Sequence, residues 1–573
     1  QCPGQYTFDP SGREAPLFAK NRRDQAQYGD AWVTPDEWML PTPISNALWE
    51  QEQEKLYPES VSINRVSGDL ADTLPLAENP VYPEKGRFEL KSTLPAGAVI
   101  RTNFHYGFPS WIGAGPYDRS ALNLALPAPP EPIAPLVLGG ADHLQSALAA
   151  LGVKGTVEIG DSLTYAKPGD ITGASDILLR SGANQRPVVR AEGTPWVISG
   201  ADTESRFALQ GVWWFGADLI LRGDFEEVVL LCSTLDPGQD LDLDGKRPQA
   251  VDGRPLDPAT LWIEGRVGNL VLQRSICGPI RTRLGGVVEK LQIEDSIVQG
   301  VRKGSESLFN SSAEIADAMR LAGRLKLGSG NLVNYLRDQF SADLLAALAS
   351  HDVDTEPEDA LLASMVEGLN AALPGEGLPQ AFLQDHVPVP VDLERALAEA
   401  PEGDDLIRLN RKVMEIAFPL ELGQAAVAVV CDEINMVRST VLGRVYGRRI
   451  SASETILAGY ARADDIQNGC VRFSSYVKGS MLHQPYESVC TREGSALFVS
   501  RRFGDPAYGQ LARLADMDIL SPEPGDTIKA GAQNRSEMGA YALEKYPIKE
   551  RGLLIKLREY MPVGLTPVLI YQT

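Results

Sequence analysis

A short pattern that returns at a regular interval constrains this chain more than any other sequence feature. Apolar residues, a polar pair and a hydroxyl residue follow one another in Leu270–Ile276, and Leu291–Ile297 repeats this order, so that Ser275 and Ser296 lie 21 residues apart. A looser copy places Ser233 a further 42 residues upstream of Ser275. Alternating strands in a repeat of roughly 20 to 25 residues are typical of a parallel β-solenoid, in which each turn of chain stacks on the next.

The same pattern reappears far downstream, at 435–443, 450–457 and 469–474. Between the two groups, residues 305–425 show the three- and four-residue apolar spacing of amphipathic helices. We therefore predict one solenoid that an α-helical insertion interrupts. The alternative is a β-sandwich, because short strands at short intervals also build sandwiches.

Composition and pattern divide the chain into segments that we expect to be structurally distinct. They are an extended arm rich in proline and aromatic residues at 1–56, a small β domain at 57–123, a proline-rich linker at 124–140, the first part of the solenoid at 141–304, the α-helical insertion at 305–425, the second part of the solenoid at 426–490, and a C-terminal cap or docking segment at 491–573. The arm lacks the periodicity to bury its own rings, so it is expected either to dock on another chain or to wrap around its own domain.

The charge balance limits the classes of partner. The formal net charge is −22 and the pI is near 4.8. Nucleic acid and anionic membranes attract basic surfaces, so neither is an expected partner. The chain also has no run of 18 apolar residues, and no membrane span is expected.

The compartment is less constrained by the sequence. No signal-peptide pattern is visible after Gln1, but the first residue is not Met, which leaves a removed leader open. The six cysteines are scattered, which favours a reducing compartment and leaves disulfides between turns as the alternative. The expected location is therefore a cytoplasmic assembly or a phage-tail-like particle, or the outside of the cell if a leader has been removed.

No catalytic constellation emerges from the motifs. A hydrolase would need two carboxylates placed across one face, and the Gly-His-Gly and Arg-Ile-Lys motifs of polygalacturonases are missing. A lyase would need a basic residue beside acidic calcium ligands, and candidates lie close together in sequence. They are Arg281, Arg283, Arg302 and Lys303, with Glu294 and Asp295. Any solvated solenoid carries such charges on its outer face, so we assign no catalytic residue and expect no organic cofactor.

One acidic loop is a candidate metal site. Asp240, Asp242 and Asp244 alternate before Gly245, like the first half of a calcium-binding loop. The closing glutamate of such a loop is absent, because position 12 is Val251. The sequence therefore leaves two interpretations, a structural calcium site and an acidic loop between turns.

Several phrases carry a resemblance to known proteins. A helix at 142–151 followed by Thr156–Ile159 resembles the entry of right-handed parallel β-helix proteins of the pectate-lyase-like class. The chain also resembles large bacterial β-helix proteins that occur with phage-tail-like contractile injection systems. This second resemblance rests on residues 6–18, 104–108, 115–119, 296–298 and 536–540. It implies a right-handed parallel β-helix with a small N-terminal β domain, and a setting in a large particle, without an attached activity.

Two functions are expected from these observations. The first is a non-enzymatic structural or assembly component that contacts other protein subunits, with homo-oligomers included. The alternative is an extracellular β-helix protein that binds or cleaves a polysaccharide. A saccharide site would need an aromatic groove along the turns, for which Trp213, Trp214 and Phe215 are candidates. Alternate side chains point inward, so at most part of that trio can be exposed.

Overall fold

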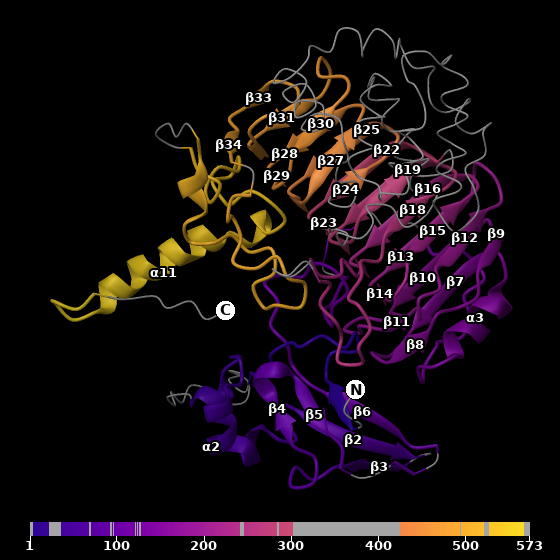
Figure 1. Ribbon diagram of the computed structural model, residues 1–573, viewed down its shortest axis with the longest axis vertical. Helices are drawn as coiled ribbons and strands as arrows, with labels where there is room; N and C mark the ends of the chain where they lie inside the picture. The colour runs from indigo at the N-terminus through magenta and orange to yellow at the C-terminus, as the bar shows by residue number, and fades with distance from the viewer. Residues whose placement is uncertain are drawn as a thin grey trace, which may run out of the picture.

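The body of the protein is a stack of parallel β-strands. The computed structural model describes residues 4–21, 36–67, 70–91, 94–95, 97–120, 122, 124, 128–240, 246–282, 286–301, 425–492, 494–520 and 526–566. In this part of the chain, three parallel sheets of ten, ten and eight strands run side by side (Figure 1). Each turn of chain, or rung, adds a strand to the sheets in succession. This arrangement is a parallel β-helix, and it confirms the predicted fold class.

The strands of each sheet pair in chain order. The first sheet consists of β7 (Lys154–Ile159), β10 (Asp176–Ser181), β13 (Arg206–Gln210), β16 (Phe225–Leu231), β19 (Arg266–Gln273), β22 (Val287–Glu294), β25 (Cys431–Val437), β28 (Ile450–Ser453), β31 (Cys470–Arg472) and β33 (Pro485–Tyr486). The second sheet consists of β8 (Thr164–Ala166), β11 (Val188–Arg190), β14 (Trp213–Phe215), β17 (Thr234–Leu235), β20 (Ile276–Cys277), β23 (Ile297–Gln299), β26 (Thr440–Leu442), β29 (Ile456–Leu457), β32 (Ser475–Val477) and β34 (Val489–Thr491). The third sheet consists of β9 (Ile171–Ala174), β12 (Trp196–Gly200), β15 (Leu219–Arg222), β18 (Leu261–Ile263), β21 (Ile280–Thr282), β24 (Ala425–Ala428), β27 (Arg444–Gly447) and β30 (Ala461–Ala463).

The stack continues across the long interval between β23 and β24. Strand β22 pairs with β25, and β23 pairs with β26, so that Ile297 lies beside Thr440. The two groups of repeats therefore belong to the same sheets, and the β-sandwich alternative is wrong. The predicted α-helical insertion at 305–425 lies outside the described residues, apart from Ala425, which begins β24.

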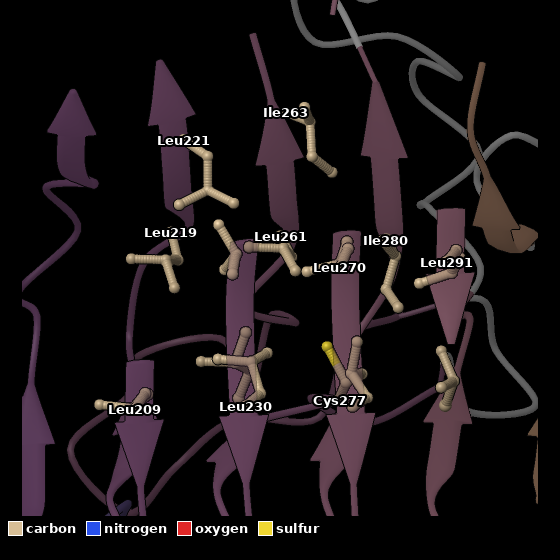
Figure 2. Close-up of a cluster of buried hydrophobic side chains, with 14 of the residues drawn as sticks. Leu209, Leu219, Leu221, Leu230, Leu261, Ile263, Leu270, Cys277, Ile280 and Leu291 are labelled. Atoms are coloured by element: carbon tan, nitrogen blue, oxygen red, sulfur yellow. The ribbon is translucent and has the colours of Figure 1, made fainter. Parts of the chain in front are cut away.

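Inward-facing apolar side chains form columns along the axis of the β-helix. Parallel register puts Leu219 beside Leu261 and Leu261 beside Ile280, and Figure 2 shows these side chains in one row. A second column runs through Leu209 and Leu230. Each of these residues is almost fully buried. Burying one side chain of this size contributes about 1.5–3 kcal/mol. Each further leucine or isoleucine in a column makes a similar contribution.

A tight turn between the first and second sheets explains the recurring sequence pattern. Its central residue has a left-handed backbone, with φ between +45° and +53°, in seven rungs of the described chain. These residues are Cys232, Arg274, Asp295, Arg438, Glu454, Phe473 and Glu487. A serine or threonine follows each of them. The polar pair and hydroxyl of the sequence pattern are therefore the corner of the β-helix.

The hydroxyl after each corner bonds backbone groups of neighbouring rungs. The Ser275 hydroxyl accepts from the Ser233 N–H at 3.2 Å, and it has the carbonyl oxygens of Leu230 and Gln273 at 2.9 and 3.1 Å. The Ser275 N–H donates in turn to the Ser296 hydroxyl at 3.0 Å. Equivalent bonds of 3.1–3.4 Å join Ser439 to Thr455, Thr455 to Ser474 and Ser474 to Ser488. We call this row the hydroxyl ladder.

The first rung is covered by helix α3 (His143–Leu151). Its Leu144 and Leu148 are buried in the core of the β-helix, as expected for a capping helix. Asp142 lies at the N-cap position of this helix, but its side chain makes no capping hydrogen bond. Just before the helix, Ile133 and Val137 form parallel bridges to the first rung.

The N-terminal part forms two small antiparallel sheets beside the β-helix (Figure 1). One contains β1 (Gln5–Thr7), β5 (Arg87–Glu89) and β4 (Val81–Tyr82), and the other contains β3 (Leu70–Thr73), β2 (Ser62–Ser67) and β6 (Val99–Asn103). Helix α2 (Asn46–Leu56) and the short helices η1 (Glu37–Met39) and η2 (Pro83–Lys85) complete this part. Phe8, Leu17 and Trp49 pack with Ile63 and Phe88 in its core. The described part of the arm thus wraps around its own domain.

The C-terminal segment covers the outer face of the second sheet. Ile297, Leu442 and Ile456 point outward from that sheet and pack against Tyr508 and Met538 of the segment. The segment contains the short helices η3 (Ala515–Asp518) and η4 (Ala542–Glu544) and ends in helix α11 (Tyr546–Tyr560). None of the described helices is both long and apolar enough to cross a bilayer.

The hydroxyl ladder predicts a specific stability effect. Ser275→Ala removes the hydroxyl that accepts from the Ser233 N–H and donates to a buried backbone carbonyl oxygen. We therefore expect the unfolding free energy to fall by about 1–3 kcal/mol. Ser488→Ala is the matched control, because Ser488 ends the ladder in a more exposed rung. Chemical denaturation followed by circular dichroism measures both variants. Equal losses for the two would contradict the ladder's role.

Candidate functional site

Three segments that are distant in sequence meet over the outer face of the second sheet. They are the N-terminal segment around Arg13, the loop 104–119, and the C-terminal residues 497–546. We call this region the junction. Aromatic and charged side chains gather in this region, so it is the candidate site.

The loop 104–119 is held to the β-helix by a glycine–alanine pair. The Gly113 N–H donates to the Arg274 carbonyl oxygen at 2.7 Å, and the Ala114 N–H donates to the Thr234 hydroxyl at 2.9 Å. Gly113 has φ +77°, and a Cβ there would lie 2.6 Å from the Thr234 hydroxyl and 2.8 Å from Ile276. Only glycine therefore fits this contact.

A second glycine–alanine pair repeats this contact farther along the β-helix. The Gly539 N–H donates to the Glu454 carbonyl oxygen at 2.7 Å, and the Ala540 N–H donates to the Thr440 hydroxyl at 2.9 Å. Thr440 opens β26 as Thr234 opens β17, three rungs earlier in the second sheet. The chain thus uses the same backbone clasp twice, once before the β-helix and once after it.

A buried ion pair lies at the centre of the junction. The Arg13 guanidinium forms a two-pronged pair with the Asp236 carboxylate, and both side chains are only 2% exposed. Asp236 also accepts from the Trp213 indole at 3.3 Å and from the Gly238 N–H at 2.8 Å. The Arg13 guanidinium lies 5.1 Å from the ring centre of Phe503. One ion pair therefore links the N-terminal domain, the β-helix and the C-terminal segment.

An aromatic cavity of about 290 Å³ opens beside this ion pair. Its walls come from all three parts and include Tyr106, Trp111, Trp213 and Phe503. Arg186 is held between two of these rings, 4.4 Å from the centre of Tyr106 and 4.7 Å from that of Trp213. A guanidinium between two aromatic faces is held by cation–π attraction and keeps its N–H edge free to meet an anion.

The rim of the cavity carries a flat aromatic platform. Trp111 is 54% exposed and stacks on Tyr117, with ring centres 5.9 Å apart and planes 9° apart. Of the aromatic trio in β14, Trp214 lies in the core, while Trp213 and Phe215 point outward but are covered. The trio therefore contributes a wall to the cavity and no open groove along the rungs.

A buried carboxyl group lies under the second clasp. Glu537 is 3% exposed, and no described group donates a hydrogen bond to its Oε1. Burial raises the pKa of this carboxyl to about 8, because the charged form loses its hydration. The group is therefore protonated in the folded protein at neutral pH.

The basic and acidic residues considered for a lyase do not converge in the described chain. Glu294 and Asp295 both pair with Arg438 of the next rung. Arg281 belongs to the third sheet, where its guanidinium lies 5.9 Å from the ring centre of Trp262 and donates to the Ala425 carbonyl oxygen at 3.3 Å. Arg283, Arg302 and Lys303 fall outside the described residues.

The candidate calcium loop is described only at its start. Asp240 follows β17 in the loop that also contains Asp236, while Asp242 and Asp244 fall outside the described residues. Elsewhere in the described chain, no cluster of histidine, cysteine and carboxylate groups has the geometry of a metal site. The cysteines at 232, 277, 431, 470 and 490 are free thiols.

Comparisons with known proteins find no relative of this chain. No family model matches it, and neither a curated protein nor a solved structure matches it. What the structure establishes is the class of protein, a parallel β-helix with a small β domain clasped to its side.

Sequence analysis missed the residues that build the junction. Arg13 and Asp236 lie 223 positions apart, and no local pattern pairs them. Arg186 follows a turn, and no motif in the sequence marks it. The clasp did leave a signal, because Ile112-Gly113-Ala114 and Met538-Gly539-Ala540 share an apolar-Gly-Ala order.

The buried ion pair predicts a large stability effect. Arg13→Met leaves the Asp236 carboxylate buried without its partner, which costs about 3–5 kcal/mol. Limited proteolysis and thermal unfolding should show that the N-terminal domain is released first. The control is Arg65→Met, which breaks the exposed pair with Asp72 and should cost less than about 1 kcal/mol. A small effect of Arg13→Met would refute the central role of this pair.

Glu537 predicts a pH dependence of stability. Its carboxyl has an ordinary pKa of 4.5 in the unfolded chain and about 8 in the folded protein. The folded state therefore keeps a proton that the unfolded state has released, and this contribution to stability falls as the pH rises from 4.5 to 8. Glu537→Gln should gain stability relative to the natural chain over that window. Thermal unfolding at several pH values, with the exposed Glu50→Gln as control, measures the difference. A difference that does not change with pH would disprove the assignment.

Proposed function

We propose that the chain is a non-enzymatic structural component of a large bacterial particle, a scaffold or appendage of the kind associated with phage-tail-like contractile injection systems. The observation that carries this proposal is the pairing of charged side chains between neighbouring rungs. They pair from rung to rung, as in Arg180 with Glu158 and Arg222 with Glu264. Charged groups that pair along the stack stiffen it, and among the described residues they are engaged with one another and do not converge as acid, base and ligand groups.

The resemblance to injection-system proteins supports the same proposal. Its phrases at 104–108 and 115–119 flank the first clasp, and the phrase at 536–540 contains the second. The resemblance therefore lies in the segments that tie the β domain and the C-terminal segment to the β-helix. On this proposal the partners are other protein subunits, and the chain acts in a cytoplasmic assembly or on the assembled particle. If a leader has been removed, it acts outside the cell.

A second candidate function is saccharide binding at the junction cavity. The specific observation is the combination of the exposed Trp111 platform and the Arg186 guanidinium at one cavity. Sugar rings stack their C–H faces on aromatic rings, and a guanidinium binds a carboxylate through two hydrogen bonds. The cavity suits one acidic sugar unit better than a long chain, because the second sheet beyond it is covered by the C-terminal segment.

One experiment separates the two candidates. The purified chain is mixed with polygalacturonate and alginate oligosaccharides, and binding is followed by tryptophan fluorescence while cleavage is followed by absorbance of unsaturated products. The scaffold function predicts neither signal. The saccharide function predicts binding that Trp111→Ala abolishes and that the control Tyr486→Ala, an exposed aromatic on β33, leaves unchanged. Cleavage of either glycan would overturn the scaffold proposal.

The positive test of the scaffold function is sedimentation from the native host. A tagged chain should co-sediment with particles far larger than its own 62.1 kDa. A chain that stays entirely in the light fractions of cells that contain such particles would count against the proposal.

A further inference from the structure

Helix α11 stands apart from the rest of the molecule. Figure 1 shows it projecting from the body in yellow, away from both the β-helix and the N-terminal domain. Only its start is anchored, because the Tyr546 hydroxyl donates to the Pro109 carbonyl oxygen and its ring lies 6.4 Å from that of Tyr541. No residue of the helix is buried.

The helix exposes apolar side chains that the body of the protein would normally cover. Leu553 is 48% exposed, Ile555 is 57% exposed and Tyr560 is 77% exposed. Val563 and Leu565, which follow the helix, are also exposed. By contrast, the outward-facing Leu442 and Ile456 of the second sheet are covered by the C-terminal segment. Exposed apolar side chains that gather on one helix and the residues after it are typical of an interaction site.

The sequence of α11 does not stabilise an isolated helix. A helix of 15 residues is marginal in water even when it is rich in alanine. Gly552 lies at its middle, where it costs about 1 kcal/mol relative to alanine, and the helix has no side-chain cap at its N-terminus. Packing against another surface is therefore the missing source of stability.

Charge indicates which surface that is. The helix carries four basic side chains, Lys549, Arg551, Lys556 and Arg558, against two glutamates, a net charge of +2. The whole chain has a net charge of −22, so the remainder carries −24. A basic helix is electrostatically complementary to an acidic surface. A second copy of this chain offers such a surface.

We propose that α11 docks on the acidic body of a second copy of this chain and joins the copies into an oligomer. The proposal rests on the proposed structural function and names its first partner. Apolar side chains supply affinity, and the basic side chains steer the helix to the acidic body. A helix that projects from one copy onto the body of the next gives a closed dimer when the contact is reciprocal.

Sedimentation velocity of the full chain tests this contact. Samples from about 1 to about 100 µM cover affinities in the micromolar range. The natural chain should shift from 62.1 kDa toward twice that mass as its concentration rises. Leu553→Ser with Ile555→Ser should weaken association at least tenfold and leave the melting temperature of the β-helix unchanged. Leu514→Ser with Met517→Ser is the matched control, because it removes two exposed apolar side chains outside α11.

A charge variant tests the electrostatic half of the contact. Lys556→Glu with Arg558→Glu should weaken association at low salt. It should also reduce the loss of association that the natural chain shows between about 50 and about 500 mM salt, because screening acts on charge attraction. A chain that stays monomeric throughout, or a serine variant that associates like the natural chain, would overturn the proposal. Neither result would contradict the scaffold function, because co-sedimentation with particles tests that function separately.

Discussion

The structure depends on the left-handed corner between the first and second sheets. Each rung must leave the first sheet and enter the second within two residues, and the first of these, such as Arg274 or Asp295, has φ near +48°. That backbone conformation is unfavourable for a residue other than glycine. The hydroxyl ladder offsets the cost, because each serine or threonine bonds backbone groups on both sides of the corner. Stacked corners keep the rungs in register, and the inner columns of leucine and isoleucine follow from that register.

The same register makes the outer face of the second sheet a repetitive docking surface. Thr234 and Thr440 present the same hydroxyl three rungs apart, and each receives the N–H of an alanine that follows a close-packed glycine. The N-terminal domain and the C-terminal segment are therefore fastened by the same contact. The buried pair between Arg13 and Asp236 then adds specificity, because only one alignment of the three parts brings the two charges together.

Much of the fold could be predicted from residues near one another in sequence. The interval between Ser275 and Ser296 is one turn of the β-helix, because these residues follow the paired strands β19 and β22. The candidate site could not be predicted in this way. The cavity collects Trp111, Arg186 and Phe503 from segments that meet only after the β-helix has formed. Arg186 has no sequence feature that distinguishes it from the arginines of the outer rungs.

The sequence by itself determined the repeating unit: its length, its corner chemistry and its apolar columns. These are local properties, because each rung contacts only its neighbours and the pattern of one rung specifies the next. Tertiary structure alone decided that the N-terminal arm folds back on its own domain and that the termini clasp one face of the β-helix. It also decided that, among the described residues, α11 is anchored only near its start. Those outcomes depend on contacts between residues hundreds of positions apart, and their complementarity appears only when the rungs are stacked.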